Sequence, residues 1–307
     1  MSIAYISHPD CQLHEMGAHH PEQPARLTAI SDRLVASGLD MVLHHFDAPL
    51  AERSMLLLAH DERYVEQVYA TAPEQGLVWL DGDTAMNPHT LQAALRAVGA
   101  VSLGVDLVMQ GRVRQVFCAV RPPGHHAERA RGMGFCIFNN VAIAALHALQ
   151  AHGLERVAIV DFDVHHGNGT EDIVAGDERI LFCSSFQHPF YPHSGADTDV
   201  PNVINSPLPA GAGGAALREV VERQWLPALR EFAPQLLLIS AGFDGHAADD
   251  MAQLNFVDTD YAWVTGQLCQ LASESAQGRV VSALEGGYEL HALARSVEAH
   301  IKAFMDY

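Results

Sequence analysis

Seven short apolar runs, separated by segments with helical periodicity, constrain the fold of this 307-residue chain more than any other feature. Most of these runs are continuously apolar, which is typical of strands buried on both faces of a parallel sheet. The runs occupy residues 3–6, 41–46, 116–120, 157–160, 180–183, 236–239 and 280–284. We therefore expect an α/β fold with a doubly wound, mostly parallel sheet flanked by helices.

The segments between these runs carry apolar residues at helical spacing. One of them stops at Gly38 and another at Gly153, because glycine readily adopts the left-handed conformation that ends many helices. Helices are expected at residues 22–37, 90–110, 140–152 and 214–232. Since no repeat, linker or change in composition interrupts the chain, we expect residues 1–307 to form a single domain.

The net charge of the chain indicates which classes of binding partner are unfavourable. It has 37 acidic and 18 basic residues and a formal net charge of -19, which would repel a phosphate backbone and gives little attraction to anionic lipid. Nucleic acid and membranes are therefore not expected as partners. The same acidity fits either a solvated surface or attraction of cationic molecules such as polyamines and lysine-rich tails, and charge alone does not choose between them.

The N-terminal residues and the cysteines point to a cytoplasmic protein. The N-terminus lacks the basic segment and longer apolar stretch of a secretory signal, and no apolar run is expected to reach the roughly 18 residues of a membrane span. The five cysteines form no C-x-x-C pair, so we interpret them as reduced structural thiols. An oligomer is compatible with the sequence, but its state is not readable from it.

Four of the expected strands run directly into polar or glycine-rich segments. Ligands bind at the carboxyl edge of open parallel sheets, so these segments, far apart in the sequence, are expected to meet in one crevice. The segments are RPPGHH from Arg121, DFDVHHGNG from Asp161, SAGFDG from Ser240 and EGGY from Glu285.

The segment that follows residues 157–160 predicts a metal site. Asp161, Asp163 and His165 alternate, so their side chains would point the same way at the end of a buried strand, where carboxylates need a cation or hydrogen bonds. Asp163 and His165, joined by Asp244, would offer three ligands and leave a position for water, as in catalytic zinc sites. The same ligands also suit iron(II) or cobalt(II), and Asp244 alone could equally cap backbone amides.

Two other strand ends could supply acid–base and oxyanion chemistry. The pair His125-His126 follows a rigid Pro-Pro-Gly segment, unlike His19-His20 and His44-His45, and could accept a proton from an activated water. Tyr288 follows Gly286 and Gly287, which allow a ligand to approach closely. Its hydroxyl could donate to an oxyanion, although packing at a helix start is the alternative.

Together these motifs resemble the arginase/deacetylase superfamily and, within it, the zinc-dependent histone deacetylase-like amidohydrolases of the class II type. The matching segments cover nearly the whole chain in the order of that family, and as a set they are highly specific. They are HHPEQPARLTAI from His19, RPPGHHAERARGMGFCIFNNVAIAA from Arg121, DFDVHHGNGTEDI from Asp161, SAGFDGHAAD from Ser240 and LEGGYEL from Leu284.

The resemblance implies one catalytic zinc ion, held by Asp163, His165 and Asp244, with Tyr288 as the oxyanion donor. Arginase, on the same fold, binds two manganese ions with further aspartates after the D-x-H element. In this chain the residues that follow are His166, Gly167 and Asn168, so one catalytic metal is the better fit.

The resemblance also assigns roles to the histidine pair. His126 would act as general base and then as general acid, while His125 assists electrostatically. Asp161 would orient His125, and Asn168 would be the partner of His126. Class I relatives have aspartate at the position of Asn168, so an asparagine there leaves His126 less strongly tuned by a neighbouring charge.

A structural potassium ion and a narrow substrate tunnel are further implications of the resemblance. The potassium ligands would come from Asp161, Asp163, His165, Ser184 and Ser185. Phe135 and Tyr191 resemble the aromatic walls that clasp an acyl-lysine stem, and the other expected substrate-binding residues are Gly134, Met251, Gly286 and Gly287. Phe186 and His193 stand where relatives often carry histidine and glycine.

The leading hypothesis for function is hydrolysis of N-acyl, chiefly acetyl, amides on lysine side chains of a peptide or protein. An acetylpolyamine amidohydrolase would use the same chemistry on a small acetylated amine, with a carboxylate at the tunnel mouth. The candidates for that carboxylate are Asp81, Asp83, Asp249 and Asp250. A remote alternative is a non-catalytic acyl-lysine binding protein, although every expected catalytic residue is present.

Overall fold

The computed structural model describes residues 2–307 and is built on an eight-stranded sheet in which every pairing is parallel. The strand order is β2-β1-β5-β10-β9-β6-β7-β8. The strands are β1 (Ile3–Ser7), β2 (His44–Asp47), β5 (Gln115–Cys118), β6 (Val157–Asp161), β7 (Ile180–Gln187), β8 (Val203–Leu208), β9 (Leu236–Ala241) and β10 (Val280–Leu284). The predicted α/β fold with a mostly parallel sheet is confirmed.

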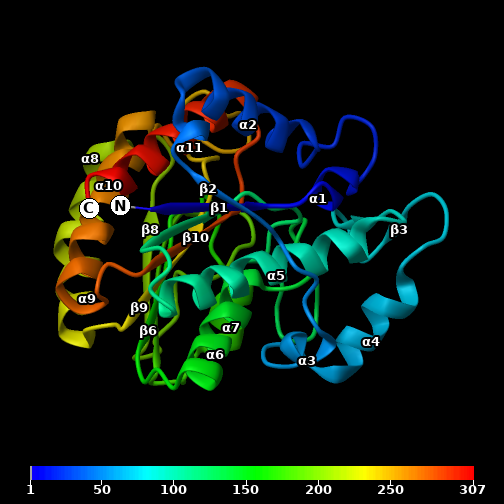
Figure 1. The fold of residues 1–307 in the computed structure, drawn as a ribbon, viewed down its shortest axis with the longest axis horizontal. Coiled ribbons are helices and arrows are strands. Elements are labelled where there is room, and N and C mark those ends of the chain that lie inside the picture. The colour runs from blue at the N-terminus through cyan, green and yellow to red at the C-terminus, as the bar shows by residue number, and fades with distance from the viewer. Residues whose placement is uncertain (1) are drawn as a thin grey trace.

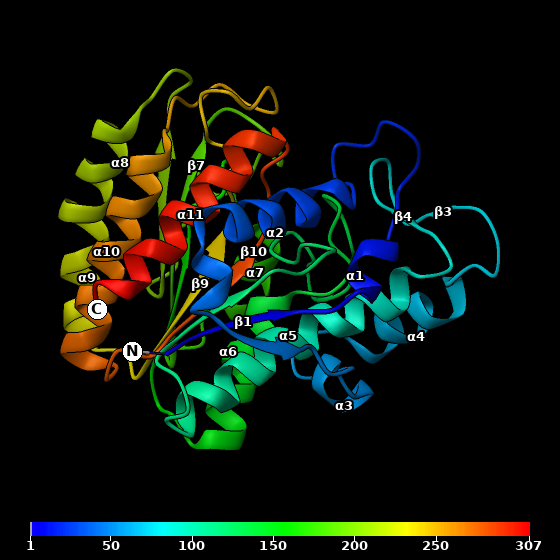
Figure 2. The ribbon, with the colours of Figure 1, turned by 45° about the horizontal axis from the view of Figure 1, so that its top comes forward.

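Helices cover both faces of this sheet, as Figures 1 and 2 show. One side carries α2 (Ala25–Ser37), α8 (Gly214–Val220), α9 (Leu226–Phe232), α10 (Asp258–Ser275) and α11 (Leu290–Met305). The other side carries α5 (Thr90–Met109), α6 (Asn140–His152) and α7 (Asn168–Val174). Shorter elements complete the chain: α1 (Asp10–Leu13), η1 (Leu39–Met41), α3 (Arg53–Leu56), α4 (Glu62–Thr71), the antiparallel pair β3 (Val78–Trp79) and β4 (Ala85–Met86), and η2 (Val221–Trp225).

Several element boundaries differ from the sequence-based expectation. The helix expected from residue 22 begins at Ala25, because Glu22 is buried in an ion pair with Arg26 and Arg121 instead of opening the helix. The expected helix 214–232 is interrupted by the π-helical turn η2, next to Pro227, which has no N–H to offer the preceding turn. The strand expected at 41–46 starts three residues late, since residues 39–41 form η1.

Strand β8 was not expected from the sequence. It lies at the edge of the sheet beside β7, and most of its residues are only partly buried. It contains Asn205, Ser206 and Pro207, so it lacks the continuous apolar run by which the other strands were recognised.

By length and composition, helix α5 could cross a membrane, with a mean hydropathy of 1.5, but 67% of that window is buried within the fold. It is not a continuous apolar run, because it includes Gln92, Arg96 and Asp106. It packs against α6, β5 and β10. The contact with β10 is close at Gly104, where an added Cβ would lie 2.8 Å from Cγ1 of Val281. The helix therefore has the environment of a core helix.

All five cysteines lie buried, without a disulfide between them. Burial raises the pKa of the Cys11 thiol to about 11 and that of Cys269 to about 12. These thiols are therefore protonated near neutral pH and pack as small apolar side chains.

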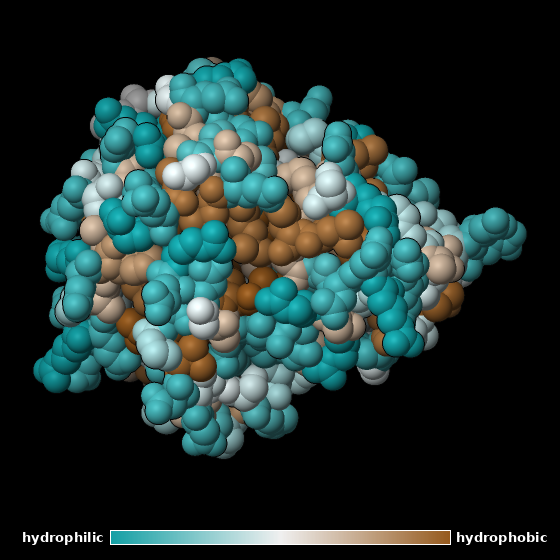
Figure 3. Space-filling model, turned by 90° about the horizontal axis from the view of Figure 1, so that it is seen from below, coloured by the Kyte–Doolittle hydropathy of each residue, from teal (hydrophilic) through white to brown (hydrophobic). Residues whose placement is uncertain are grey.

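Figure 3 shows the face that lies at the bottom of Figure 1, where α3, α6 and α7 are found. Polar side chains cover most of this face, and apolar side chains gather in a hollow near its centre. The polar covering agrees with the excess of acidic residues in the composition.

Candidate active site

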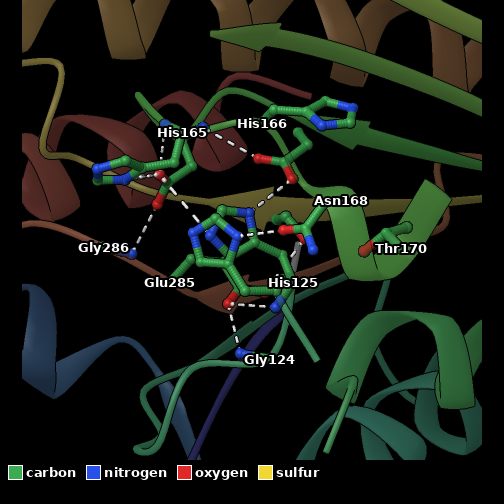
Figure 4. Close-up of polar contacts among 12 residues, drawn as sticks. Gly124, His125, His165, His166, Asn168, Thr170, Glu285 and Gly286 are labelled. Atoms are coloured by element: carbon green, nitrogen blue, oxygen red, sulfur yellow. Dashed lines mark hydrogen bonds and ion pairs between the residues drawn. The ribbon is translucent and has the colours of Figure 1, made fainter. Parts of the chain in front are cut away.

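The predicted crevice exists because four of the polar segments follow neighbouring strands. The strands β5, β10, β9 and β6 are adjacent in the sheet and run in the same direction, so their carboxyl ends meet at one edge. Asp161 is the last residue of β6, and the segments after β5, β9 and β10 bring His125, Asp244 and Gly286 to the same edge. Figure 4 shows the resulting cluster of histidines and carboxylates.

Asp163, His165 and Asp244, the predicted metal ligands, converge in the structure. All three are buried, and one ligand atom from each lies within 4.8 Å of the others. His165 Nδ1 is 3.0 Å from Asp163 Oδ1 and 3.3 Å from Asp244 Oδ2. Asp244 Oδ1 accepts a hydrogen bond from the Val164 backbone, whereas Asp244 Oδ2 is buried without a hydrogen-bond partner in the described chain.

Two glycines leave room for these carboxylates. A Cβ at Gly242 would collide with Asp163 Oδ2, and one at Gly286 would collide with Asp244 Oδ2. The Gly286 N–H also donates to Asp163 Oδ2 over 2.9 Å. Gly286 therefore lies against the carboxylates, whereas a Cβ at Gly287 would meet Leu293 and Phe243.

The electrostatics of this cluster favour a bound cation. Burial, reinforced by the charge of Asp163, raises the pKa of Asp244 to about 6. Burial opposes a charge on His165, but Asp163 and Asp244 prevail and raise the pKa of this histidine to about 9. Asp244 and His165 thus retain protons more strongly than usual, whereas the pKa of Asp163 is lowered by His125 and His165 in spite of its burial, as expected where buried carboxylates need positive charge. The donor set, the unpartnered oxygen of Asp244 and the glycine spaces fit a zinc ion.

The two neighbouring histidines have different partners and different charge states. His125 Nδ1 is 2.9 Å from Asp161 Oδ2, and His126 Nδ1 is 2.7 Å from Asn168 Oδ1. Burial disfavours a charge on His125, but Asp163 and Asp161 outweigh it and raise the pKa of His125 to about 10. Burial, with the charges of His125 and His165, lowers the pKa of His126 well below its usual value. Among the protein's own groups, these shifts favour a proton on His125 and a neutral His126.

The neutral His126 has a defined tautomer. Asn168 Nδ2 donates to Glu128 Oε1 over 2.8 Å, which orients the amide so that its oxygen faces the ring. An amide oxygen only accepts, so Nδ1 of His126 carries the proton. Nε2 is then an acceptor, and it has no hydrogen-bond partner within residues 2–307. Glu128 thus helps to fix the tautomer of His126 through Asn168, a role that the sequence did not reveal.

A cavity of about 210 Å³ opens onto His126 and His165. Its walls bring together the predicted residues Gly134, Phe135, Tyr191, Met251 and Tyr288, and they add Asp83 and Phe190. The Tyr288 ring lies edge-on to Phe135, with ring centroids 5.9 Å apart. An acyl chain on a narrow stem would therefore pass between aromatic rings before it reaches the histidines.

Tyr288 is held by groups on either side of it. Asp249 Oδ2 accepts hydrogen bonds from the backbone N–H groups of Tyr288 and Glu289, at 2.6 Å and 2.9 Å. The Arg26 guanidinium lies 4.9 Å from the centre of the Tyr288 ring. Asp249, one of the candidates for a carboxylate at the tunnel mouth, thus binds the protein backbone, whereas the candidate Asp83 lines the cavity.

The comparison with protein-family models decides the identity of this arrangement. The model described as "Histone deacetylase domain" matches residues 20–304. The chain belongs to the histone deacetylase family.

Individual members of the family are similar along almost the whole chain. "Histone deacetylase 14, chloroplastic" of Arabidopsis thaliana is 38% identical over 93% of this chain and 73% of its own length. "Polyamine deacetylase HDAC10" of Homo sapiens is 38% identical over 94% of this chain and 44% of its own length. The solved HDA15 HD domain superimposes with a TM-score of 0.94 at 33% identity, covering 99% of this chain and 88% of that one. Membership of the family supports deacetylase hydrolysis by this protein.

The residues expected to hold potassium lie at and just beyond the end of β6 and, for the two serines, within the neighbouring strand β7. Asp161 and Ser184 are paired in register on the two strands. The hydroxyls of Ser184 and Ser185 are buried without a hydrogen-bond partner in the chain as described. Such oxygen atoms fit a hard cation. Phe186 packs on the buried His166, with ring centroids 4.7 Å apart, and His193 adopts a positive φ of 65°.

Glu285 is a second contributor that the sequence did not reveal. Its carboxylate accepts hydrogen bonds from the backbone N–H groups of Gly124 and His125 and from the Ser240 hydroxyl, at 2.6, 3.2 and 3.1 Å (Figure 4). It joins the ends of β5, β9 and β10 and so positions the histidine pair. Burial raises the pKa of Glu285 to about 7.

Proposed function

We propose that this protein hydrolyses N-acyl amides, chiefly acetyl amides, on lysine side chains with a zinc-dependent mechanism. The observation that carries the proposal is the geometry of the histidine pair: His126 Nδ1 faces Asn168 Oδ1, so that Nε2 can accept a proton, and His125 Nδ1 faces Asp161 Oδ2. The pKa shifts, upward for His125 and downward for His126, agree with this arrangement. Both histidines stand beside a buried set of three metal ligands and a narrow aromatic cavity.

Asp163, His165 and Asp244 would hold the zinc ion. When bound, zinc supplies Lewis-acid activation of the amide carbonyl and of water. Potassium at Asp161 and the two serines would be structural and would hold the end of β6 in place.

Three side chains of the protein would carry out proton transfer and charge stabilisation. His126 Nε2 accepts the proton of the attacking water and later donates it to the departing amine. The hydroxyl of Tyr288, which lines the same cavity, donates to the oxyanion that forms at the carbonyl carbon. The cation on His125 stabilises the developing negative charge and keeps His126 neutral until it receives the proton.

The cavity supports an acylated aliphatic amine as substrate. Phe135, Phe190 and Tyr191 offer apolar faces to a methylene stem, and Met251 adds an apolar side chain. A lysine side chain in a peptide or protein has this shape.

Acetylated polyamines are the second candidate substrates. Asp83 is the carboxylate that lines the cavity, and it could pair with a second amine of a polyamine. Two contacts already engage its Oδ1, one from the Thr84 hydroxyl at 2.9 Å and one from the Gly134 N–H at 3.2 Å. Because Asp83 serves this loop contact, we rank lysine first.

A direct comparison tests the proposal. Zinc-reconstituted protein and a metal-stripped control are incubated with an acetyl-lysine peptide and with acetylated spermidine, and acid release is measured. We expect zinc-dependent turnover with a higher kcat/KM for the peptide. A higher kcat/KM for acetylated spermidine than for the peptide would favour the polyamine alternative. Tight peptide binding by the zinc-loaded protein without acid release from either substrate or from longer acyl groups would favour a binding protein.

A further inference from the structure

A second cluster of metal-ligating side chains lies between α5 and α6, away from the active site. Asp106 projects from α5, and His147 and His152 project from α6. One ligand atom from each lies within 4.8 Å of the others. The two helices pack side by side in Figures 1 and 2.

Both histidine side chains of this cluster point at one carboxylate oxygen. His147 Nε2 and His152 Nε2 lie 2.8 and 2.7 Å from the same atom, Asp106 Oδ1. The two imidazole rings are nearly perpendicular, at 88°, with centroids 5.6 Å apart. A simple hydrogen-bonded link between the helices needs only one of these rings, whereas two ring nitrogens and a carboxylate make a three-ligand set for a transition metal.

Small movements would convert these hydrogen bonds into metal bonds. Ligand atoms around a tetrahedral zinc ion, with bonds of about 2.0–2.1 Å, are separated by about 3.3 Å. Each histidine nitrogen would therefore move away from Asp106 Oδ1 by about half an ångström, which side-chain rotation allows. Neither histidine Nδ1 nor Asp106 Oδ2 has a hydrogen bond within residues 2–307 that would resist this movement.

The cluster is accessible to an ion from solvent. The side chains of His147, His152 and Asp106 are 17%, 21% and 36% exposed. Both histidine rings reach the same carboxylate oxygen of Asp106, and its second oxygen has no hydrogen-bond partner within residues 2–307. An ion could thus bind with water in its remaining position.

The cluster is separate from the catalytic centre. The N-cap of α6, Asn139, hydrogen-bonds the Ala127 backbone next to the catalytic histidines, and His152 is the last residue of α6. A helix of 13 residues, at 1.5 Å per residue, places these ends about 18 Å or more apart.

We propose that Asp106, His147 and His152 form a second site for a divalent transition metal of the zinc type, which clamps α5 to α6. It would stabilise the folded chain and take no part in hydrolysis, since none of its ligands approaches the cavity at His126.

Zinc binding to the zinc-loaded enzyme tests this site. Protein with its catalytic site filled is titrated calorimetrically with further zinc, and total zinc is then measured by mass spectrometry. We expect one additional ion per chain for the wild type. Asp106→Asn, His147→Gln and His152→Gln should each lose that ion and keep wild-type turnover. His44→Gln is the matched control, because it removes an exposed histidine from β2 and should keep the ion.

Two results would overturn the proposal. One is the absence of an additional ion in the wild type, and the other is an additional ion that persists in all three ligand variants. The circular dichroism spectrum of each variant shows whether it is folded. Because the three variants remove different ligands, any one that fails to fold can be left out, and the other two still test the site. The comparison depends on the difference between wild type and variants, so it holds even if the proposed catalytic zinc site fails.

Discussion

Replacement of Asn168 by aspartate should raise the pKa of His126. Asn168 Oδ1 is 2.7 Å from His126 Nδ1, so Asn168→Asp puts a negative charge against the ring without a change of shape. Two unit charges about 4 Å apart at an effective dielectric constant of about 20 attract each other by about 4 kcal/mol. At 1.36 kcal/mol per unit, the pKa of His126 should rise by as much as about 3 units.

The same substitution would create an unfavourable contact, which the experiment must remove. Asn168 Nδ2 donates to Glu128 Oε1 over 2.8 Å, so Asn168→Asp places two carboxylates against each other. The double variant Asn168→Asp/Glu128→Gln restores a donor opposite the new carboxylate. Glu128→Gln alone is the control for loss of the Glu128 charge.

The assay is the pH dependence of kcat/KM, which reports ionisations of the free enzyme. Hydrolysis needs neutral His126, so activity should fall on the acid side as this histidine becomes protonated. In the double variant this acid limb should move to higher pH by one to about 3 units. An acid limb that stays in place in both the single and the double variant would refute the assignment of His126 as the proton acceptor.

Three further predictions concern the oxyanion donor, the metal cradle and acid stability. Tyr288→Phe should lower kcat by about 10²–10³ with normal zinc content, because it removes one oxyanion donor; an unchanged kcat would contradict that role. Gly242→Ala should lose zinc and about 1–3 kcal/mol of stability, because its Cβ would collide with Asp163. Gly82→Ala is the control: a Cβ there meets open space, so this variant should match the wild type in zinc content and thermal melting. Burial lowers the pKa of His60 to about 4. The unfolded chain therefore binds a proton first, and about 3 kcal/mol of stability should be lost as pH falls from about 6.5 to about 4. Urea unfolding at a series of pH values should show this slope, with a smaller slope in His60→Gln; equal slopes would exclude His60 as a source.

The proposed metal ligands were predictable because their signal in the sequence is local. Asp163 and His165 alternate after a continuously apolar strand, and the carboxyl edge of a parallel sheet is where such residues meet. Asp244 follows another such strand, so one rule of topology places all three together.

Other contributors were not predictable because they act through contacts with distant residues. Glu128 sets the orientation of Asn168, Asp249 holds the backbone of Tyr288, and Gly242 leaves room for Asp163. None of them has a distinctive local pattern, since an acidic residue in a loop is usually only solvated and a glycine usually marks a turn.

Strand β8 and the Asp106 cluster were missed for related reasons. Strand β8 lies at the edge of the sheet, where fewer neighbours cover it, so it can contain polar residues. Because of these polar residues, β8 is not recognisable as an apolar run. Asp106 is 41 residues from His147 in the chain, and only the packing of α5 on α6 brings them together.

The sequence by itself determined the fold class, the positions of seven of the eight strands of the main sheet and the chemical types of residue that follow four of them, because hydrophobic periodicity and strand alternation act over a few residues. The tertiary structure alone decided which nitrogen of His126 carries the proton, why His125 is charged beside it, and which carboxylates face the cavity or the backbone. These properties depend on burial and on charges from separate strands within a few ångströms, and no local pattern in the chain encodes such distances.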